Sequence, residues 1–206
     1  MTVQEQDDEL APSMNLREDG LALFKFANSL PVYGIFKNQF GTLDGGCRVF
    51  AEALRDHLKG YSIPDADHGR AVDEIAVIVR KDYEKIDHFM VKRHQLDKDG
   101  SVTVSYYDGE GAGSESEVLR RIAIMEYCFD EGVTAEACRE HFTVMTFDEY
   151  QTIYGPYNNE ISLYPEWDAV DSMTALMTSE SLGEKMGLTP LELSMEQAPA
   201  NLKMAI

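Results

Sequence analysis

The sequence is poor in cysteine, in basic residues and in long apolar runs, and each shortage excludes a class of protein. Only three of its 206 residues are cysteine, and no two of them form a CxxC pair. Neither a disulfide framework nor a zinc ribbon is therefore expected. No apolar run is long enough to span a bilayer, and the acidic first residues are the opposite of a secretory signal. We expect a protein of a reducing compartment, the cytoplasm.

Basic residues are outnumbered by acidic ones. Lysine and arginine total 18, aspartate and glutamate total 37, and the formal net charge is −19. A nucleic-acid backbone and an anionic membrane surface both attract basic proteins, so we expect neither as a partner. The negative net charge is compatible with a basic binding partner. The apolar fraction of 44% is that of a globular protein with a sizeable core.

The chain divides into three parts by its patterns. Residues 1–15 form an acidic, polar stretch that we expect to be a flexible arm. Residues 16–127 mix helical and strand patterns and should form the folded core. Residues 128–206 are predicted to be a helical extension with a C-terminal tail. The expected class is α+β, with a central helix that carries a cysteine and packs on a small antiparallel sheet.

The sheet is predicted from three consecutive strand patterns, at residues 73–80, 86–94 and 101–108. The turn between the last two ends in Asp99-Gly100, a pair typical of hairpins, so these strands should pair antiparallel. A glycine-rich corner follows at 109–113. Helices are expected at 19–28, from Ser114, from Thr134 to His141, from Thr146, and at 166–177, with capping boxes at Ser114/Glu117 and Thr146/Glu149.

The central stretch is Asp44-Gly45-Gly46-Cys47, which we interpret as a loop turning into a buried helix. After Cys47, apolar residues recur at helical spacing on one face: Phe50, Ala51, Leu54 and Leu58. Free backbone N–H groups and the helix dipole favour negative charge at a helix start, so a thiolate at Cys47 would be stabilised. The alternative is that Cys47 is only a small buried hydrophobe, as many free cysteines are.

A thiol nucleophile needs a base, and the base needs a third group that orients it. The candidates are His88, near the start of the second strand, and Asp108, at the end of the third. In an antiparallel hairpin these positions are neighbours, and we expect them at the edge of the sheet that the Cys47 helix covers. Taken singly, His88 could satisfy a local hydrogen bond and Asp108 could be an ordinary turn aspartate.

The order of these residues resembles the papain-like superfamily in its transglutaminase-like and arylamine acetyltransferase-like forms. Gly45-Gly46-Cys47, Asp87-His88-Phe89 and Tyr107-Asp108-Gly109 also look like a group of small phage and bacterial proteins without known activity. The resemblance covers roughly residues 30–125. It implies Cys47 as nucleophile, His88 as base and Asp108 as orienting residue, but it does not imply a substrate.

One feature departs from the papain pattern, in which a glutamine shortly before the cysteine helps to bind the oxyanion. Here the nearest side-chain amides are Asn38 and Gln39, eight or nine positions before Cys47. They are weak candidates for this role, beside the backbone N–H of Cys47.

Other chemistry-bearing residues have simpler explanations. Cys128 and Cys138 are expected in the core, and His57 on the flank of its helix. The loop acids Asp65, Asp67, Asp97 and Asp99 do not follow a calcium-loop pattern. We therefore predict no metal site and no cofactor.

Two functions follow from these predictions. The first is a cysteine hydrolase or acyl transferase, of the protease, amidase or transamidase type, that acts on a peptide, amide or thioester. The second is a non-catalytic phage or bacterial binding protein on the same scaffold, which engages a host or partner protein, in the host cytoplasm if phage-encoded. The sequence leaves the oligomeric state open.

Overall fold

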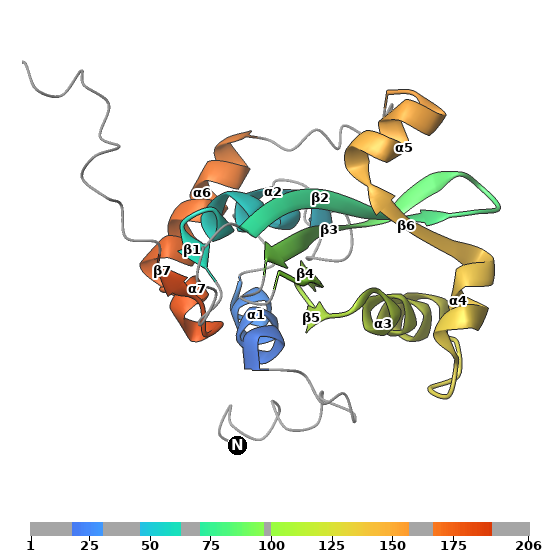
Figure 1. The fold of residues 1–206 in the computed structure, drawn as a ribbon, viewed down its shortest axis with the longest axis horizontal. Coiled ribbons are helices and arrows are strands. Elements are labelled where there is room, and N and C mark those ends of the chain that lie inside the picture. Colours follow the sequence, from blue (N-terminus) through green and yellow to red (C-terminus); the bar gives the residue numbers. More distant parts are fainter. Residues whose placement is uncertain (1–17, 31–45, 63–70, 97–99, 157–166, 191–206) are drawn as a thin grey trace, which may run out of the picture.

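The computed structural model describes residues 18–30, 46–62, 71–96, 100–156 and 167–190. The chain is a mixed α+β protein built around one antiparallel sheet (Figure 1). Its helices are α1 (Glu18–Ser29), α2 (Cys47–Leu58), α3 (Glu115–Tyr127), α4 (Ala135–His141), α5 (Phe147–Tyr154), α6 (Trp167–Ser179) and α7 (Leu182–Lys185). Its strands are β1 (Tyr61–Ser62), β2 (Ala71–Arg80), β3 (Lys85–Leu96), β4 (Val102–Asp108), β5 (Gly111–Gly113), β6 (Phe142–Thr146) and β7 (Thr189–Pro190).

The main sheet has the strand order β5-β4-β3-β2-β6, and all its pairs are antiparallel. The predicted hairpin is confirmed, because β3 pairs with β4 from Val91↔Tyr107 to Leu96↔Val102. The glycine-rich stretch after Asp108 is not only a corner, since residues 111–113 form the edge strand β5. A separate two-stranded sheet joins β1 to β7.

Strand β6 differs from the sequence analysis, which expected only helices after residue 128. Residues 142–146 lie directly between helices α4 and α5 and pair with β2, from Ala76↔Thr146 to Arg80↔Phe142. Five residues between two capped helices are too few to show a strand period clearly. Their pairing with β2 is a long-range interaction that covers an otherwise open sheet edge.

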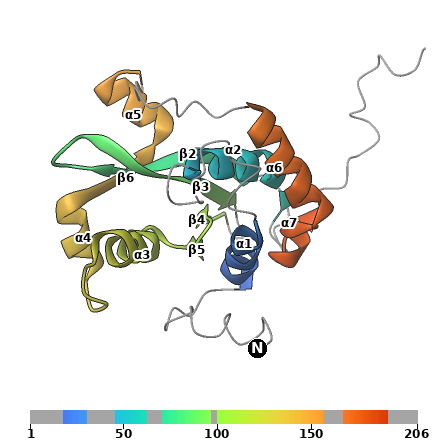
Figure 2. The ribbon, with the colours of Figure 1, turned by 180° about the vertical axis from the view of Figure 1, so that it is seen from behind.

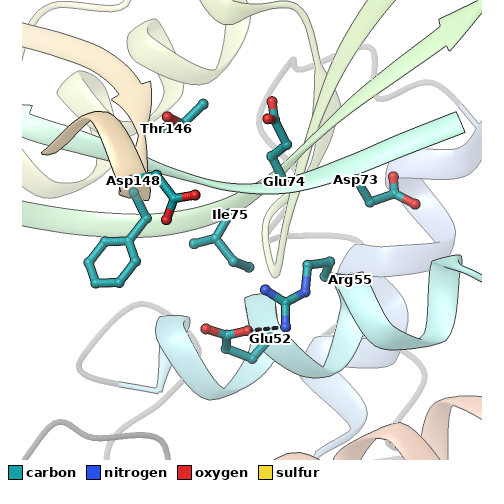
Figure 3. A pocket seen from close by; sticks show the side chains of 8 residues that line it. Glu52, Arg55, Asp73, Glu74, Ile75, Thr146 and Asp148 are labelled. Atoms are coloured by element: carbon teal, nitrogen blue, oxygen red, sulfur yellow. Dashed lines mark ion pairs between the residues drawn. The ribbon is translucent and has the colours of Figure 1, made fainter. Parts of the chain in front are cut away.

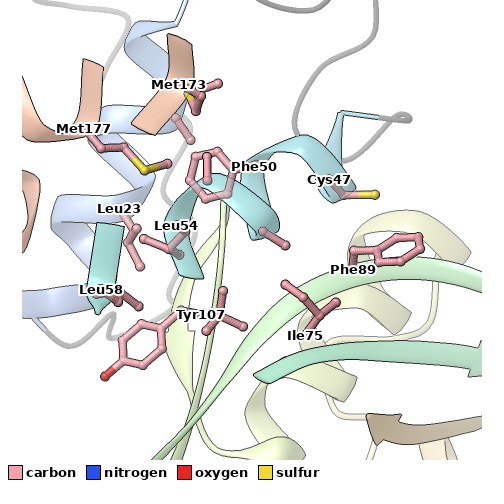
Figure 4. Close-up of a cluster of buried hydrophobic side chains, with 14 of the residues drawn as sticks. Leu23, Cys47, Phe50, Leu54, Leu58, Ile75, Phe89, Tyr107, Met173 and Met177 are labelled. Carbon is pink, nitrogen blue, oxygen red and sulfur yellow. The ribbon is translucent and has the colours of Figure 1, made fainter. Parts of the chain in front are cut away.

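Helices cover the two faces of the sheet in two layers (Figures 1 and 2). On one face, α2 packs on β3 and α6 packs on α2. The larger core lies here and includes Leu54 of α2, Val91 of β3 and Met173 of α6 (Figure 4). On the other face, α3 and α4 bury a smaller cluster that includes Met90, Ile122 and Phe142. This alternation follows from the two-residue period of strands.

Helix α2 forms as its sequence predicts and begins at Cys47. The residues on its predicted apolar face, Phe50, Ala51, Leu54 and Leu58, are all at most 1% exposed. These side chains belong to the larger core, and each fully buried Phe or Leu among them contributes about 1.5–3 kcal/mol.

His57 was predicted on the flank of this helix, and this is wrong. The side chain is buried and its Nε2 accepts a hydrogen bond of 3.1 Å from the backbone N–H of Gly183. Its Nδ1 lies 3.3 Å from Oγ1 of Thr178. His57 therefore joins α2 to the ends of α6 and α7, and its burial lowers its pKa.

The predicted helix caps are confirmed. Ser114 and Glu117 form a capping box at α3, Thr146 and Glu149 form another at α5, and Thr134 caps α4. Cys138 is buried as expected, whereas Cys128 is exposed. The reason is that Cys128 is the C-cap of α3 in a left-handed conformation, where the chain leaves the helix. No helix in the described ranges has both the length and the apolar character to cross a bilayer.

Candidate active site

Cys47 occupies the first turn of α2, where the sequence places it. The helix starts after Gly46, whose carbonyl accepts the N–H of Phe50 at 3.0 Å. The backbone N–H of Cys47 itself is one of the groups that a helix start leaves without an intrahelical partner. Figure 4 shows Cys47 at the end of α2, near Phe89 of β3. Only 7% of Cys47 is exposed, so the residue is buried.

His88 and Asp108 are in contact, as the hairpin predicts. Nε2 of His88 lies 3.2 Å from Oδ2 of Asp108, and both side chains are at most 1% exposed. Neither residue lies on an edge strand, because β3, which carries His88, and β4, which carries Asp108, are both interior strands of the sheet. The pairing of β3 with β4 stops at Val91↔Tyr107, whereas β3 continues to Lys85 beside β2. His88 therefore lies beyond the end of β4, in a part of β3 that pairs only with β2.

A β-bulge in the pairing of β2 with β3 lies next to His88. The register between β2 and β3 shifts between Ile78 and Val79, so that Ile78 pairs with His88 and Val79 pairs with Ile86. Asp87 is the extra residue, and its carboxylate accepts a hydrogen bond of 2.5 Å from the hydroxyl of Tyr127. Bulges re-aim neighbouring side chains. Here the bulge with β2 and the end of β4 lie on the two sides of His88 in the sheet.

Asp108 has two further partners that hold it in place. Its Oδ1 accepts hydrogen bonds from Arg121 Nη2 at 2.8 Å and from the backbone N–H of Glu110 at 2.9 Å. Burial opposes the charge of Asp108, but Arg121 and His88 together hold its pKa well below its usual range. The bond to Glu110 is the ordinary aspartate turn, so one oxygen of Asp108 closes the turn and the other faces His88.

Cys47 is the second group beside the His88 ring. Burial lowers the pKa of His88, but the proximity of Asp108 and Cys47 outweighs burial and raises that pKa to about 10. With Nε2 directed at Asp108, the nitrogen left for Cys47 is Nδ1. Nδ1 is buried and makes no well-aligned hydrogen bond in the described part of the chain. The sulfur is thus close to the ring but not aligned with it, which is common in sites without substrate.

The three predicted residues are therefore brought together, from α2, β3 and β4. The sequence analysis missed Arg121, which is 2% exposed and forms the back of the site. The sequence does contain a sign that Arg121 is buried, because it stands beside Ile122 and three residues after Val118, within the apolar stripe of α3. A charged residue in such a stripe indicates a buried partner. Asn38 and Gln39, the weak oxyanion candidates, lie outside the described residues.

The other histidines in the described ranges have partners outside this site. His94 pairs with Glu74 at 3.1 Å on a partly exposed part of β3, and His68 lies outside the described residues. Within the described ranges, no group of three or more potential metal-ligating side chains comes together. Comparison with protein-family models, with curated proteins and with solved structures finds no match.

Proposed function

We propose that this chain is a cysteine hydrolase or acyl transferase with a papain-like arrangement, in which Cys47 is the nucleophile. The observation that carries the proposal is the position of His88, with one nitrogen on Asp108 and Cys47 beside the ring. A nucleophile, a base and an orienting carboxylate in contact are the recurring geometry of acyl-transfer sites.

The charge state of His88 defines the starting point of the reaction. Because its pKa is raised to about 10, His88 carries a proton at neutral pH. We propose that the proton on His88 comes from the neighbouring Cys47 thiol, since a cysteine nucleophile is activated by an adjacent histidine. The thiolate is the nucleophilic form of cysteine.

In the proposed reaction, Sγ of Cys47 attacks the carbonyl carbon of an amide or thioester. The C–N or C–S bond then breaks, and the leaving amine or thiol takes the proton from His88. The acyl-cysteine is released when His88 accepts a proton from water or from an amine, which attacks the same carbon. The backbone N–H of Cys47 would donate to the developing oxyanion. Asp108, held by Arg121, keeps His88 oriented and stabilises its cation.

Acyl-enzyme trapping tests the proposal. A panel of activated acyl esters and thioesters with different acyl groups would be incubated with Cys128→Ser protein, because the exposed thiol of Cys128 would otherwise react nonspecifically. Peptide mass spectrometry should find the acyl group on Cys47, with turnover of at least one probe. Cys47→Ala in the same background should remain unmodified and inactive. Equal, slow modification of Cys47 and Cys138, or none without denaturant, would contradict catalysis.

The second candidate function is the non-catalytic binding protein. The low exposure of Cys47, 7%, favours this alternative, because a substrate must reach the sulfur. The same experiment decides between the two functions. A Cys47 that reacts with no acyl donor in the folded protein would favour a scaffold that engages a partner through its acidic surface.

A further inference from the structure

A pocket beside the candidate active site plays no part in the proposed chemistry. It lies between helix α2, strand β2 and the junction of β6 with α5 (Figure 3). Figure 3 shows Glu52 and Arg55 of α2 on one side and Ile75 and Asp148 on the other. The lining residues are Glu52, Arg55, Asp73, Glu74, Ile75, Thr146, Phe147 and Asp148.

The lining includes four acidic residues and one arginine, and Figure 3 shows that the carboxylate of Glu74 points away from α2. Arg55 is already engaged, at 2.7 Å from Oε2 of Glu52 and 3.4 Å from Asp56. Glu74 is paired with His94, which lies outside the pocket lining. Asp148 is exposed and extends toward the pocket from the first turn of α5 (Figure 3). An acidic lining of this kind attracts a cation and repels an anion.

Two of the carboxylates are buried, and one of them, Asp73, has unused hydrogen-bonding capacity. The side chains of Asp73 and Glu52 are 4% and 8% exposed. Oδ1 of Asp73 is buried and makes no hydrogen bond within the described ranges, whereas Oε2 of Glu52 is paired with Nη2 of Arg55 at 2.7 Å. The ion-pair contact of Asp73 with Arg93 is 3.6 Å long, and burial raises the pKa of both carboxyls. Buried oxygens without hydrogen bonds are costly, so a bound N–H donor would stabilise them.

The pocket is adjacent to Cys47 along α2. Arg48 and Glu52 lie one helical turn apart on the same face of the helix. The guanidinium of Arg48 lies 5.1 Å from the ring centre of Phe147, which lines the pocket, and 5.5 Å from that of Phe89. With a rise of about 1.5 Å per residue, Glu52 lies roughly 7.5 Å along the axis from Cys47. This is about the length of two residues of extended peptide.

We propose that this pocket is a specificity subsite that binds the lysine or arginine side chain of a peptide substrate, within about two residues of the reacting carbonyl. The cation is recognised and does not react. The inference rests on the proposed function for the identity of the substrate, but the binding of a basic side chain can be tested without catalysis. An organic cation fits better than a metal ion, because its N–H groups match carboxylate oxygens that are spread over three elements.

Binding would be measured with the full chain carrying Cys47→Ala, by calorimetry or by amide chemical shifts. The probes are an acetylated, amidated Gly-Gly-Lys-Gly-Gly peptide and the same peptide with norleucine in place of lysine. The lysine peptide should bind about tenfold or more tightly than the norleucine peptide, since charge-assisted hydrogen bonds distinguish them. Equal affinity of the two peptides, or no binding of either at millimolar concentration, would overturn the inference.

A pair of exposed acids provides the matched control. Asp148→Asn removes a pocket charge and should weaken lysine-peptide binding about two- to fivefold, the effect of a partly screened ion pair. Asp130→Asn removes an exposed charge outside the pocket lining and should leave binding unchanged. Equal effects of the two substitutions would show that net charge, and not the pocket, attracts the peptide.

The two proposals fail in different ways. If the lysine peptide binds as expected but Cys47 accepts no acyl group, the cation site stands and the hydrolase proposal falls. If Cys47 is acylated but norleucine and lysine peptides bind alike, the enzyme stands and this subsite falls.

Discussion

Replacing His88 by glutamine should remove much of the alkaline sensitivity of folding. The pKa of His88 is 6.5 in the unfolded reference and about 10 in the folded chain. Because the folded pKa is the higher one, protonated His88 stabilises the fold fully below pH 6.5. This stabilisation is lost as the pH rises through about 10. The prediction therefore concerns neutral to alkaline pH, and not acid.

The magnitude follows from the size of the shift. One pKa unit corresponds to about 1.4 kcal/mol, so a shift from 6.5 to about 10 is worth at most about 5 kcal/mol. Between pH 7 and pH 10 the loss should be about 3 kcal/mol, because His88 is largely protonated at pH 7 and half protonated at pH 10.

Urea denaturation at pH 7, 8, 9 and 10 measures this loss. The amide of His88→Gln can donate to Oδ2 of Asp108 and preserve the pair of Asp108 with Arg121, but it does not titrate. The difference in unfolding free energy between wild type and His88→Gln should shrink by about 3 kcal/mol over this range. His94→Gln, a histidine on the same strand with a 32% exposed side chain, controls for the loss of a ring. If the difference in unfolding free energy between wild type and His88→Gln stays constant from pH 7 to pH 10, the reasoning is refuted.

Three further predictions concern the surroundings of the site. Arg121→Met leaves the buried carboxylate of Asp108 without its cation and should cost about 3–5 kcal/mol in urea denaturation. Arg139→Met, at a 41% exposed ion pair, should cost less than about 1 kcal/mol; equal losses would contradict the burial argument. Ser114→Ala removes the cap of α3 and should lower the unfolding free energy by about 1 kcal/mol; an unchanged thermal midpoint would argue against the capping box. In native protein, Cys128 should be alkylated readily and Cys138 only after unfolding, because the first is exposed and the second is buried. Peptide mass spectrometry reads both thiols, and early labelling of Cys138 would be inconsistent with its burial.

The features that the sequence predicted well are local ones. The start of α2 at Cys47 follows from two glycines and an apolar stripe, and the β3–β4 pairing follows from a short turn between two strand patterns. Because antiparallel pairing fixes which residues are neighbours, the contact of His88 with Asp108 could be predicted as well. This prediction did not depend on knowing the structure of the segment between Cys47 and the strands.

The features that the sequence did not reveal depend on distant segments. Strand β6 exists because β2 offers an edge, and His57 is buried because α6 and α7 pack on α2. Arg121 serves Asp108 from a helix in the opposite layer. The acidic pocket is assembled from three separate stretches of the chain, in α2, in β2 and at the junction of β6 with α5. Periodicity within a single segment carries no information about such contacts.

The most direct test of the central claim is the alkylation rate of Cys47 at neutral pH, with and without His88. In a Cys128→Ser background, iodoacetamide should modify Cys47 before Cys138. His88→Gln should slow this reaction by about a hundredfold, as expected when a thiol loses its proton acceptor. If Cys47 reacts at the same rate in both proteins, His88 does not activate the sulfur and the proposed chemistry is wrong.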